Sequence, residues 1–289
     1  MKKILTAFML LALGISVAAC SPAETPESTT SAGTQAGTQA GTTTGEAEAI
    51  NVGVAFYPMK DILELIQEDM AAEGYELVIN EFTDYQTPNN LVLSKELDAN
   101  MIQHDYFLQS FNQANDADLV TVQPIYHATY ALYGKDYASV EEIPDGAVIT
   151  LPDDATNFSR ALYLLGQAEL LTFKDGKATG LTLEDIESNP KNLDLTDQVP
   201  LTSLAQRYTE TGLAIMYPTY ALSLELEGDE ERIFEEKQDD VTVNYAISLV
   251  AREDNKDSEA IQALIRHITS DKVRQLLVDD YNWASTPAF

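Results

Sequence analysis

Cysteine, histidine and basic residues are all scarce in this 289-residue sequence. The single cysteine, Cys20, rules out an internal disulfide framework and any site that needs several thiolates. Only 17 Lys and Arg residues stand against 47 Asp and Glu residues, which gives a formal net charge of −30. Because such a surface repels phosphate backbones, we expect no nucleic-acid partner.

The residue patterns of common catalytic and metal sites are also missing. No Gly-x-Ser-x-Gly nucleophile elbow occurs, and neither a His-x-x-x-His pair nor a calcium-loop spacing is present. The three histidines, His104, His127 and His267, are far apart in the sequence, and His267 falls in an amphipathic helix pattern where we expect a surface or packing role. We therefore predict that the protein is not an enzyme and uses neither a metal ion nor a cofactor.

The first 20 residues carry the pattern of a secretory signal. Two lysines precede an apolar run over 4–19, which is short of the roughly 18 to 20 residues that a membrane-spanning helix needs. Small residues directly before Cys20 resemble the lipobox of bacterial lipoproteins. The resemblance implies that residues 1–19 are a signal peptide and that Cys20 is lipidated, which anchors the chain to a membrane. The alternative is an ordinary signal peptide with a chance cysteine near its end.

Residues 20–49 are predicted to comprise the lipidated cysteine and a disordered tether. The segment is rich in Ser, Thr, Gly, Ala, Pro and Glu and repeats Gly-Thr-Gln-Ala twice in succession. Such a composition cannot bury an apolar core, so we expect a leash between the membrane and the folded part. The length of this leash favours the extracytoplasmic face of a Gram-positive cell membrane.

Beyond the tether, short β-rich runs alternate with helical periodicity, which predicts an α/β fold with largely parallel sheets. We expect two lobes, one formed by residues 50–132 with 246–289 and the other by residues 133–245. Two strands would cross between the lobes near Tyr133 and Tyr245. This is a bilobed fold of the type II periplasmic-binding-protein kind, with a ligand cleft at the hinge between two α/β lobes.

Individual elements follow from periodicity and capping signals. Strands are predicted over 99–103 and 213–216, and a helix over 258–270 with Ser258 as its N-cap. The same signals predict further strands over 147–151, 193–195 and 242–250, and helices over 157–170 and 182–187. His104 directly follows a predicted strand, so it is either a cleft residue or a hydrogen-bonding residue at the start of the next helix.

The start of the helix predicted over 157–170 combines a capping residue with a cation. Thr156 or Asn157 is the predicted N-cap, which places Arg160 in the first turn. A cation there opposes the positive end of the helix dipole, so we expect an anion beside it. A ligand carboxylate would supply that anion through charge-assisted hydrogen bonds, and an ion pair with Asp153 or Asp154 is the alternative.

Several short segments together resemble the methionine-binding lipoproteins of the NlpA/MetQ family. They are Phe82-Thr83-Asp84-Tyr85, Asp98-Ala99-Asn100, Gln103-His104, the turn from Thr156-Asn157 to Arg160-Ala161-Leu162, and Asn189-Pro190-Lys191-Asn192-Leu193. The resemblance covers nearly all of the chain after the tether. It implies a substrate-binding component of an ABC importer that holds a free amino acid, typically methionine, between its lobes. It also implies that Arg160 holds the ligand carboxylate with Asn157 nearby, and that Tyr85, Gln103 and His104 line the cleft.

At three further ligand-binding positions the chain differs from the family pattern. Tyr217-Pro218-Thr219-Tyr220 stands where the family usually has Asn-Gly-Asn-Tyr, and Ile247 replaces an Asn. We count Tyr217, Thr219 and Ile247 among the ligand-binding residues. Because a site built to hydrogen-bond polar groups loses affinity when amides are removed, we expect the ligand to be methionine, another apolar amino acid or a short peptide.

These observations predict a lipid-anchored, monomeric binding protein that passes its ligand to the permease and ATPase subunits of an ABC importer. The alternative is a surface interaction protein or adhesin that keeps the fold without transporting an amino acid. The changes at the pocket positions favour this alternative, which predicts a collapsed cleft.

Overall fold

The computed structural model describes residues 47–226 and 230–289, and these belong to one compact unit, Gly45–Phe289. The predicted signal peptide, Cys20 and nearly all of the predicted tether lie outside the described residues. The first strand begins at Glu48, two residues before the expected start of the folded part. In the described ranges, no helix combines the length and the apolar composition needed to cross a bilayer.

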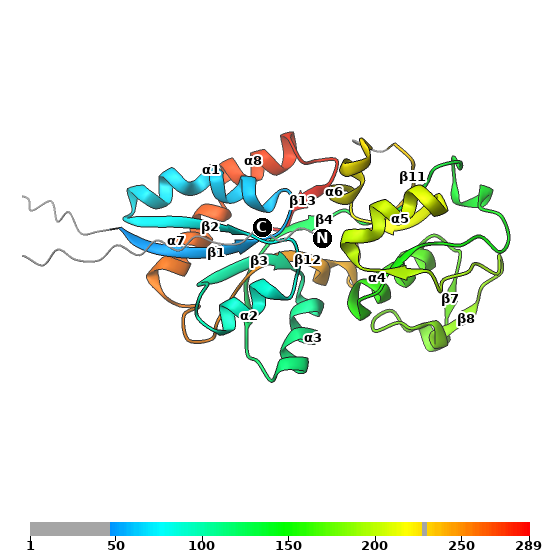
Figure 1. Ribbon diagram of the computed structural model, residues 1–289, viewed down its shortest axis with the longest axis horizontal. Helices are drawn as coiled ribbons and strands as arrows, with labels where there is room; N and C mark the ends of the chain where they lie inside the picture. The colour runs from blue at the N-terminus through cyan, green and yellow to red at the C-terminus, as the bar shows by residue number, and fades with distance from the viewer. Residues whose placement is uncertain (1–46, 227–229) are drawn as a thin grey trace, which may run out of the picture. The chain divides into compact units, whose positions relative to one another are not determined.

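The larger sheet has six strands in the order β13-β4-β12-β3-β1-β2 (Figure 1). Its members are β1 (Glu48–Val54), β2 (Tyr75–Glu81), β3 (Ala99–Gln103), β4 (Val120–Ala128), β12 (Ala246–Ala251) and β13 (Ser285–Pro287). Strand β1 runs parallel to β2 and β3, whereas all other pairs are antiparallel. The expectation of largely parallel sheets is therefore wrong, because β4 leaves this sheet for the second lobe and β12 returns beside it in the opposite direction.

Helices cover both faces of the larger sheet, with α1 and α8 on one side and α2 and α3 on the other (Figure 1). These helices and their neighbour α7 are α1 (Met59–Ala72), α2 (Thr87–Leu93), α3 (Asp105–Asn115), α7 (Glu259–Ile268) and α8 (Asp271–Asp279). Helix α1 buries one apolar face, and Gly74 follows it in the left-handed conformation at φ 92°. Ser258 caps α7 as predicted, since its side chain accepts a hydrogen bond from the Ile261 N–H.

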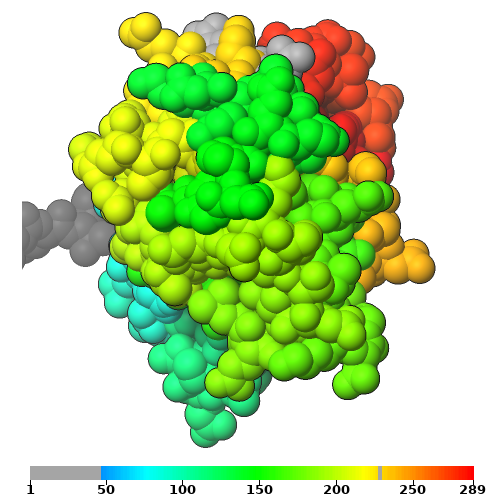
Figure 2. Space-filling view, turned by 90° about the vertical axis from the view of Figure 1, so that its right-hand side faces the viewer, coloured from blue at the N-terminus to red at the C-terminus, as the bar shows by residue number. Residues whose placement is uncertain are grey.

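The smaller lobe is built on a three-stranded antiparallel sheet in the order β10-β5-β11. Its strands and helices are β5 (Ala131–Gly134), β10 (Leu213–Met216), β11 (Arg232–Glu235), α4 (Ala155–Gln167), α5 (Leu204–Thr211) and α6 (Pro218–Ala221). Two short pairs accompany them, β6 (Leu151–Pro152) with β9 (Gln198–Val199) and β7 (Thr172–Phe173) with β8 (Ile186–Ser188). Residues coloured green to yellow, which belong to this lobe, cover most of the face seen in Figure 2.

Several predicted elements of the smaller lobe differ from the structure. The strand predicted over 147–151 is reduced to β6 and isolated bridges, and the segment over 193–195 contributes only a single bridge. The helix predicted over 182–187 is one 3₁₀ turn, Leu183–Asp185, followed by β8. The first part of the strand predicted over 242–250 is a 3₁₀ turn, Thr242–Tyr245. Short apolar runs do not distinguish strand from turn by periodicity alone, which explains these errors.

The fold is bilobed and of the α/β class, and the chain passes twice between the two sheets. The first passage joins β4 to β5, and the second joins β11 to β12 through residues 236–245. The boundaries of the lobes at residues 132/133 and 245/246 stay a prediction. The two passages bring residues from distant parts of the chain to the junction, where the candidate site lies.

Candidate binding cleft

A cavity at the junction of the lobes gathers most of the residues that the sequence singled out. Its volume is about 20 Å³, which is room for about one water molecule. It is lined by Phe56, Tyr85, Ile102, Gln103, His104, Phe107, Asn157, Leu201, Tyr217 and Ile247. Six of the eight predicted ligand-binding residues are therefore in the wall, and Arg160 and Thr219 are not.

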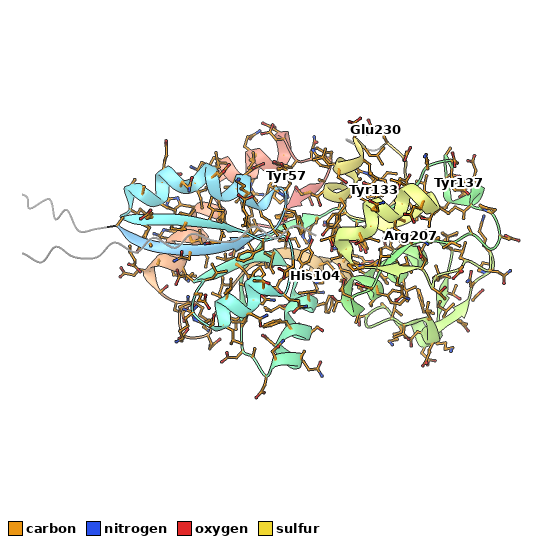
Figure 3. All side chains as sticks on the ribbon, in the orientation of Figure 1. Tyr57, His104, Tyr133, Tyr137, Arg207 and Glu230 are labelled. Atoms are coloured by element: carbon orange, nitrogen blue, oxygen red, sulfur yellow. The ribbon has the colours of Figure 1, made fainter. Side chains whose placement is uncertain are left out.

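His104 has both of the roles that the sequence left open. It directly follows β3 and caps α3, because its Nδ1 accepts a hydrogen bond from the Phe107 N–H at 3.2 Å. Its Nε2 lies 3.3 Å from Oδ1 of Asn157 in the other lobe, so the ring bridges the junction, where Figure 3 shows it. Burial lowers the pKa of His104 to about 3, and the nearby Arg160 charge acts in the same direction. The neutral ring therefore carries its proton on Nε2 and donates it to Asn157.

Gln103 belongs to a buried network of amides behind the cavity wall. Its Oε1 accepts from Nδ2 of Asn89 at 2.7 Å, and its Nε2 donates to Oδ1 of Asn89 at 2.5 Å and to Oδ1 of Asn100 at 3.1 Å. Asn100 in turn donates to Oδ1 of Asn89 at 2.8 Å. Since the three buried amides hydrogen-bond to one another, the network fixes the position of Gln103 in the cavity wall.

Helix α4 begins earlier than predicted, and this changes the position of Arg160. Asp154, not Thr156 or Asn157, is the N-cap, and its Oδ1 accepts from the Asn157 N–H at 2.9 Å. The helix then starts at Ala155, so Arg160 lies in the second turn rather than the first. The helix dipole acts mainly on the first turn, so the predicted conflict between Arg160 and the dipole does not arise.

Arg160 is paired with Glu236, a partner that the sequence analysis did not identify. Its Nε donates to both carboxylate oxygens of Glu236, at 2.9 and 3.2 Å, and its Nη2 donates to Oε2 at 2.5 Å. Nη2 also donates to the Ala128 carbonyl at 3.1 Å. The side chains of Arg160 and Glu236 are only 2% and 6% exposed. The alternative of an ion pair with Asp153 or Asp154 is therefore wrong, and the ligand role of Arg160 stays a prediction.

Two aromatic rings flank the guanidinium. Its central carbon lies 4.7 Å from the ring centre of Tyr130 and 4.6 Å from that of Tyr245. Both tyrosines and Glu236 belong to the passages between the lobes, and Ala128 is the last residue of β4, where the first passage begins. Arg160 therefore ties α4 to both passages at once, through hydrogen bonds and cation–π contacts.

Tyr217 separates Arg160 from the cavity. Its hydroxyl donates to Oδ1 of Asn157 at 2.7 Å and accepts from Nη1 of Arg160 at 3.1 Å. Burial raises the pKa of Tyr217 to about 12, so the hydroxyl stays protonated near neutral pH. The tyrosine that replaces a family amide thus joins Arg160, Asn157 and His104 into one chain of hydrogen bonds.

Two further tyrosines, Tyr85 and Tyr220, also connect the lobes. The hydroxyl of Tyr85, which follows β2, is hydrogen-bonded to the hydroxyl of Tyr220 in α6. Phe56 packs against both rings, with centroid distances of 5.5 Å to Tyr85 and 5.8 Å to Tyr220. The sequence analysis placed Tyr85 in the cleft but did not single out Phe56, which lies two residues after the end of β1.

Three buried hydroxyls lack a hydrogen-bond partner within the residues that the structure describes: that of Tyr133 in β5, and two that bear on the candidate site. One belongs to Thr219, which was predicted to bind ligand but does not line the cavity. The other belongs to Tyr126, the cross-strand neighbour of Ile247 in the β4–β12 pair. Ile247 lines the cavity, and Tyr126 shares its face of the sheet because paired residues point the same way. Tyr126 was not identified from the sequence.

The profile of the NlpA lipoprotein family matches residues 50–289. The chain belongs to this family. The D-methionine-binding lipoprotein MetQ of Salmonella typhi is 33% identical over 227 residues, which cover 78% of this chain and 82% of that protein. Two solved structures are similar to this chain in fold as well as in sequence.

One of these structures is a nutrient binding protein from Burkholderia cenocepacia bound to methionine, with a TM-score of 0.77 and 27% identity over 83% of this chain and all of the other. The second is the substrate binding protein of a methionine transporter from Streptococcus pneumoniae, with a TM-score of 0.76 and 29% identity over 83% of this chain and 96% of the other. The similarity in fold confirms the bilobed binding-protein architecture. Members of the family are binding proteins rather than enzymes.

Proposed function

We propose that the chain is the substrate-binding protein of an ABC importer and takes up methionine or a related amino acid or short peptide in the cleft between its lobes. The observation that carries the proposal is the cavity, which both lobes line and where apolar side chains surround a few polar groups. Phe56, Ile102, Phe107, Leu201 and Ile247 suit an unbranched apolar side chain. Relatives described as methionine-binding proteins support the same ligand class.

Ligand entry requires the lobes to move apart. A cavity of about 20 Å³ is far smaller than the roughly 300 to 1,000 Å³ of sites that enclose small molecules. Ligand entry breaks contacts that join the lobes across the cleft, among them the side-chain bridges Tyr85–Tyr220 and His104–Asn157. Micromolar affinity corresponds to about 8 kcal/mol, which the ligand must supply after the loss of these contacts.

We also propose where the protein lies in the cell and which partners it contacts. Cys20 holds the chain, as a monomer, on the extracytoplasmic face of a Gram-positive cell membrane, and the tether lets the folded part reach permease and ATPase subunits in the same membrane. The support for these points is the lipobox-like sequence, the length of the tether and the membership of a family of lipoproteins.

A surface interaction protein that does not transport an amino acid is the second candidate. One observation favours it, since the polar groups that face the cleft already bind one another in the Arg160–Tyr217–Asn157–His104 chain. A cleft that satisfies its own polar groups has less to gain from a ligand.

Titration calorimetry distinguishes the two functions. The full-length lipoprotein in detergent is titrated with L-methionine, D-methionine, L-leucine and a methionine-containing dipeptide. Saturable binding of at least one of these supports the importer function. No binding to any of them, together with native mass spectrometry that finds no co-purified small molecule, contradicts that function and supports the surface candidate.

A further inference from the structure

We propose that the Tyr217 hydroxyl, rather than the Arg160 guanidinium, makes the main direct contact with the ligand's carboxylate, and that Glu236 holds Arg160 behind it as a positioning residue. This inference rests on the proposed function, because it requires a ligand that bears a carboxylate. It assigns a specificity-determining role to a residue at which this chain differs from the pattern of its family.

The first reason is that Tyr217 lies closer to the cleft cavity than Arg160 does. Tyr217 and Asn157 line the cleft cavity, whereas Arg160 and Glu236 line a separate cavity of about 410 Å³. The Tyr217 hydroxyl lies between the two cavities, 3.1 Å from Nη1 of Arg160. A ligand in the cleft therefore meets the hydroxyl of Tyr217 before it can reach the guanidinium.

The second reason is that four of the five N–H donors of Arg160 already have acceptors. Nε donates to Glu236, and the two N–H groups of Nη2 serve Glu236 and the Ala128 carbonyl. Nη1 donates to Tyr217, which leaves one Nη1 N–H group for any other acceptor. The Nε–Nη2 edge, which could bind a ligand carboxylate in bidentate fashion, is thus occupied by Glu236.

The third reason is that Glu236 cannot easily be displaced. Its side chain is 6% exposed, and losing Arg160 would leave a buried carboxylate without a counter-ion. Glu236 contacts the guanidinium through the Nε–Nη2 edge, while Nη1 is directed to Tyr217 at the cleft. The pair is neutral as a whole but presents its positive end to Tyr217, which makes the hydroxyl a better donor.

The hydrogen bonds allow Tyr217 to change acceptor at small cost. Its O–H now points to Oδ1 of Asn157, and that oxygen is also 3.3 Å from the Nε2 of His104. When the lobes close on a ligand, the O–H rotates to a carboxylate oxygen, and Asn157 regains the hydrogen bond from His104. The exchange then leaves neither Tyr217 nor Asn157 without a hydrogen-bond partner.

The test compares L-methionine with L-methioninamide, in which a neutral amide replaces the carboxylate. Titration calorimetry on the full-length lipoprotein measures both ligands for the wild type, Tyr217→Phe and the control Tyr130→Phe. Tyr130 also flanks Arg160, but its hydroxyl reaches only the Asn157 carbonyl, at 3.4 Å, and does not line the cleft cavity. We expect Tyr217→Phe to weaken methionine binding about 10- to 150-fold, as for the loss of one hydrogen bond to an ionised group, with little change for the amide. Tyr130→Phe should keep the wild-type preference.

Binding of the amide shows that each variant is folded, and a second variant separates the outcomes. Glu236→Gln should reduce the preference for methionine over its amide, because Arg160 is held less firmly behind Tyr217. A gain in methionine affinity in Glu236→Gln, or an unchanged preference in Tyr217→Phe, would overturn the inference while leaving the proposed function intact. If the wild type binds neither these two ligands nor any other amino acid, the proposed function fails and the inference fails with it.

Discussion

Arg160 and Glu236 form a buried, doubly hydrogen-bonded ion pair between helix α4 and the second passage of the chain between the lobes. The two residues are 76 positions apart in the sequence. The same guanidinium binds the Ala128 carbonyl at the end of β4, so one side chain connects both passages with the smaller lobe. This arrangement makes Arg160 a structural residue of the hinge whatever its role toward a ligand.

Removal of either member of this pair is expected to destabilise the protein. Glu236→Ala leaves a buried guanidinium without its counter-ion and should lower the free energy of unfolding by about 3 to 5 kcal/mol. Urea denaturation measures the change, and Glu64→Ala is the control. Glu64 pairs with Lys60, and the two side chains are 50% and 39% exposed, so removal of Glu64 should cost less than about 1 kcal/mol. Equal losses for the two variants would contradict the importance of the buried pair.

The reciprocal change, Arg160→Ala, should be about as destabilising, because it leaves Glu236 buried and unpaired. The double variant Arg160→Met with Glu236→Met removes both charges and should be more stable than either single alanine variant. A double variant that unfolds as readily as the worse single variant would show that packing, not charge, dominates.

The cap of α4 gives a local test with a neighbouring control. Asp154 accepts hydrogen bonds from the main chain and the side chain of Asn157, so Asp154→Ala should cost about 0.5 to 2 kcal/mol of stability. Asp153 is exposed, and Asp153→Ala should change stability by less than about 0.5 kcal/mol. Thermal unfolding followed by circular dichroism distinguishes the two variants. A larger loss of stability for Asp153→Ala than for Asp154→Ala would contradict Asp154 as the N-cap.

The buried His104 predicts a loss of stability in acid. The pKa of His104 in the folded protein, about 3, lies below the ordinary value of 6.5. Between pH 3 and 6.5 the histidine is therefore protonated in the unfolded chain but neutral in the folded protein. The stabilising contribution is fully present above pH 6.5 and decreases as the pH falls toward 3, by about 1.4 kcal/mol per pH unit at most. Urea unfolding at several pH values should show a shallower slope for His104→Gln than for the wild type. Identical slopes would argue that His104 titrates normally.

The lipid anchor predicts a change of location. Cys20→Ser removes the only thiol of the chain, so the protein should move from the membrane fraction to the soluble fraction after cell fractionation. Metabolic labelling with a fatty acid should mark the wild type and not the variant. A Cys20→Ser protein that still needs detergent for release would mean that another segment holds it to the membrane.

Local signals predicted the elements whose ends depend on nearby residues. Strand β3 over 99–103 and strand β10 over 213–216 lie where the apolar runs placed them, and Ser258 caps α7 as its position before an apolar stripe indicated. The start of α4 was misplaced because Asp154, Thr156 and Asn157 are all acceptable capping residues. Which one caps depends on where β6 ends, and that is set by its pairing with β9.

Contacts across the cleft could be foreseen only in part. The strand ends and the family resemblance identified Tyr85, His104 and Asn157, which the cavity does bring together. Neither the Tyr85–Tyr220 bridge nor the role of Tyr217 between Arg160 and the cavity could be read from spacing, because Tyr85 and Tyr220 come from different lobes and Tyr217 lies 57 positions from Arg160. Periodicity describes a residue's own element and carries no information about the element that packs against it.

By itself, the sequence determined the alternation of strands and helices, the absence of thiolate chemistry beyond Cys20, the acidic charge and the signals at the N-terminus, since each depends on composition or on residues a few positions apart. Only the tertiary structure decided that β4 and β12 run in opposite directions and that Glu236, rather than a nearby aspartate, neutralises Arg160. The physical reason is burial. A guanidinium that loses water must find a carboxylate within hydrogen-bonding distance, and the passages between the lobes, not the sequence neighbours of Arg160, bring one there.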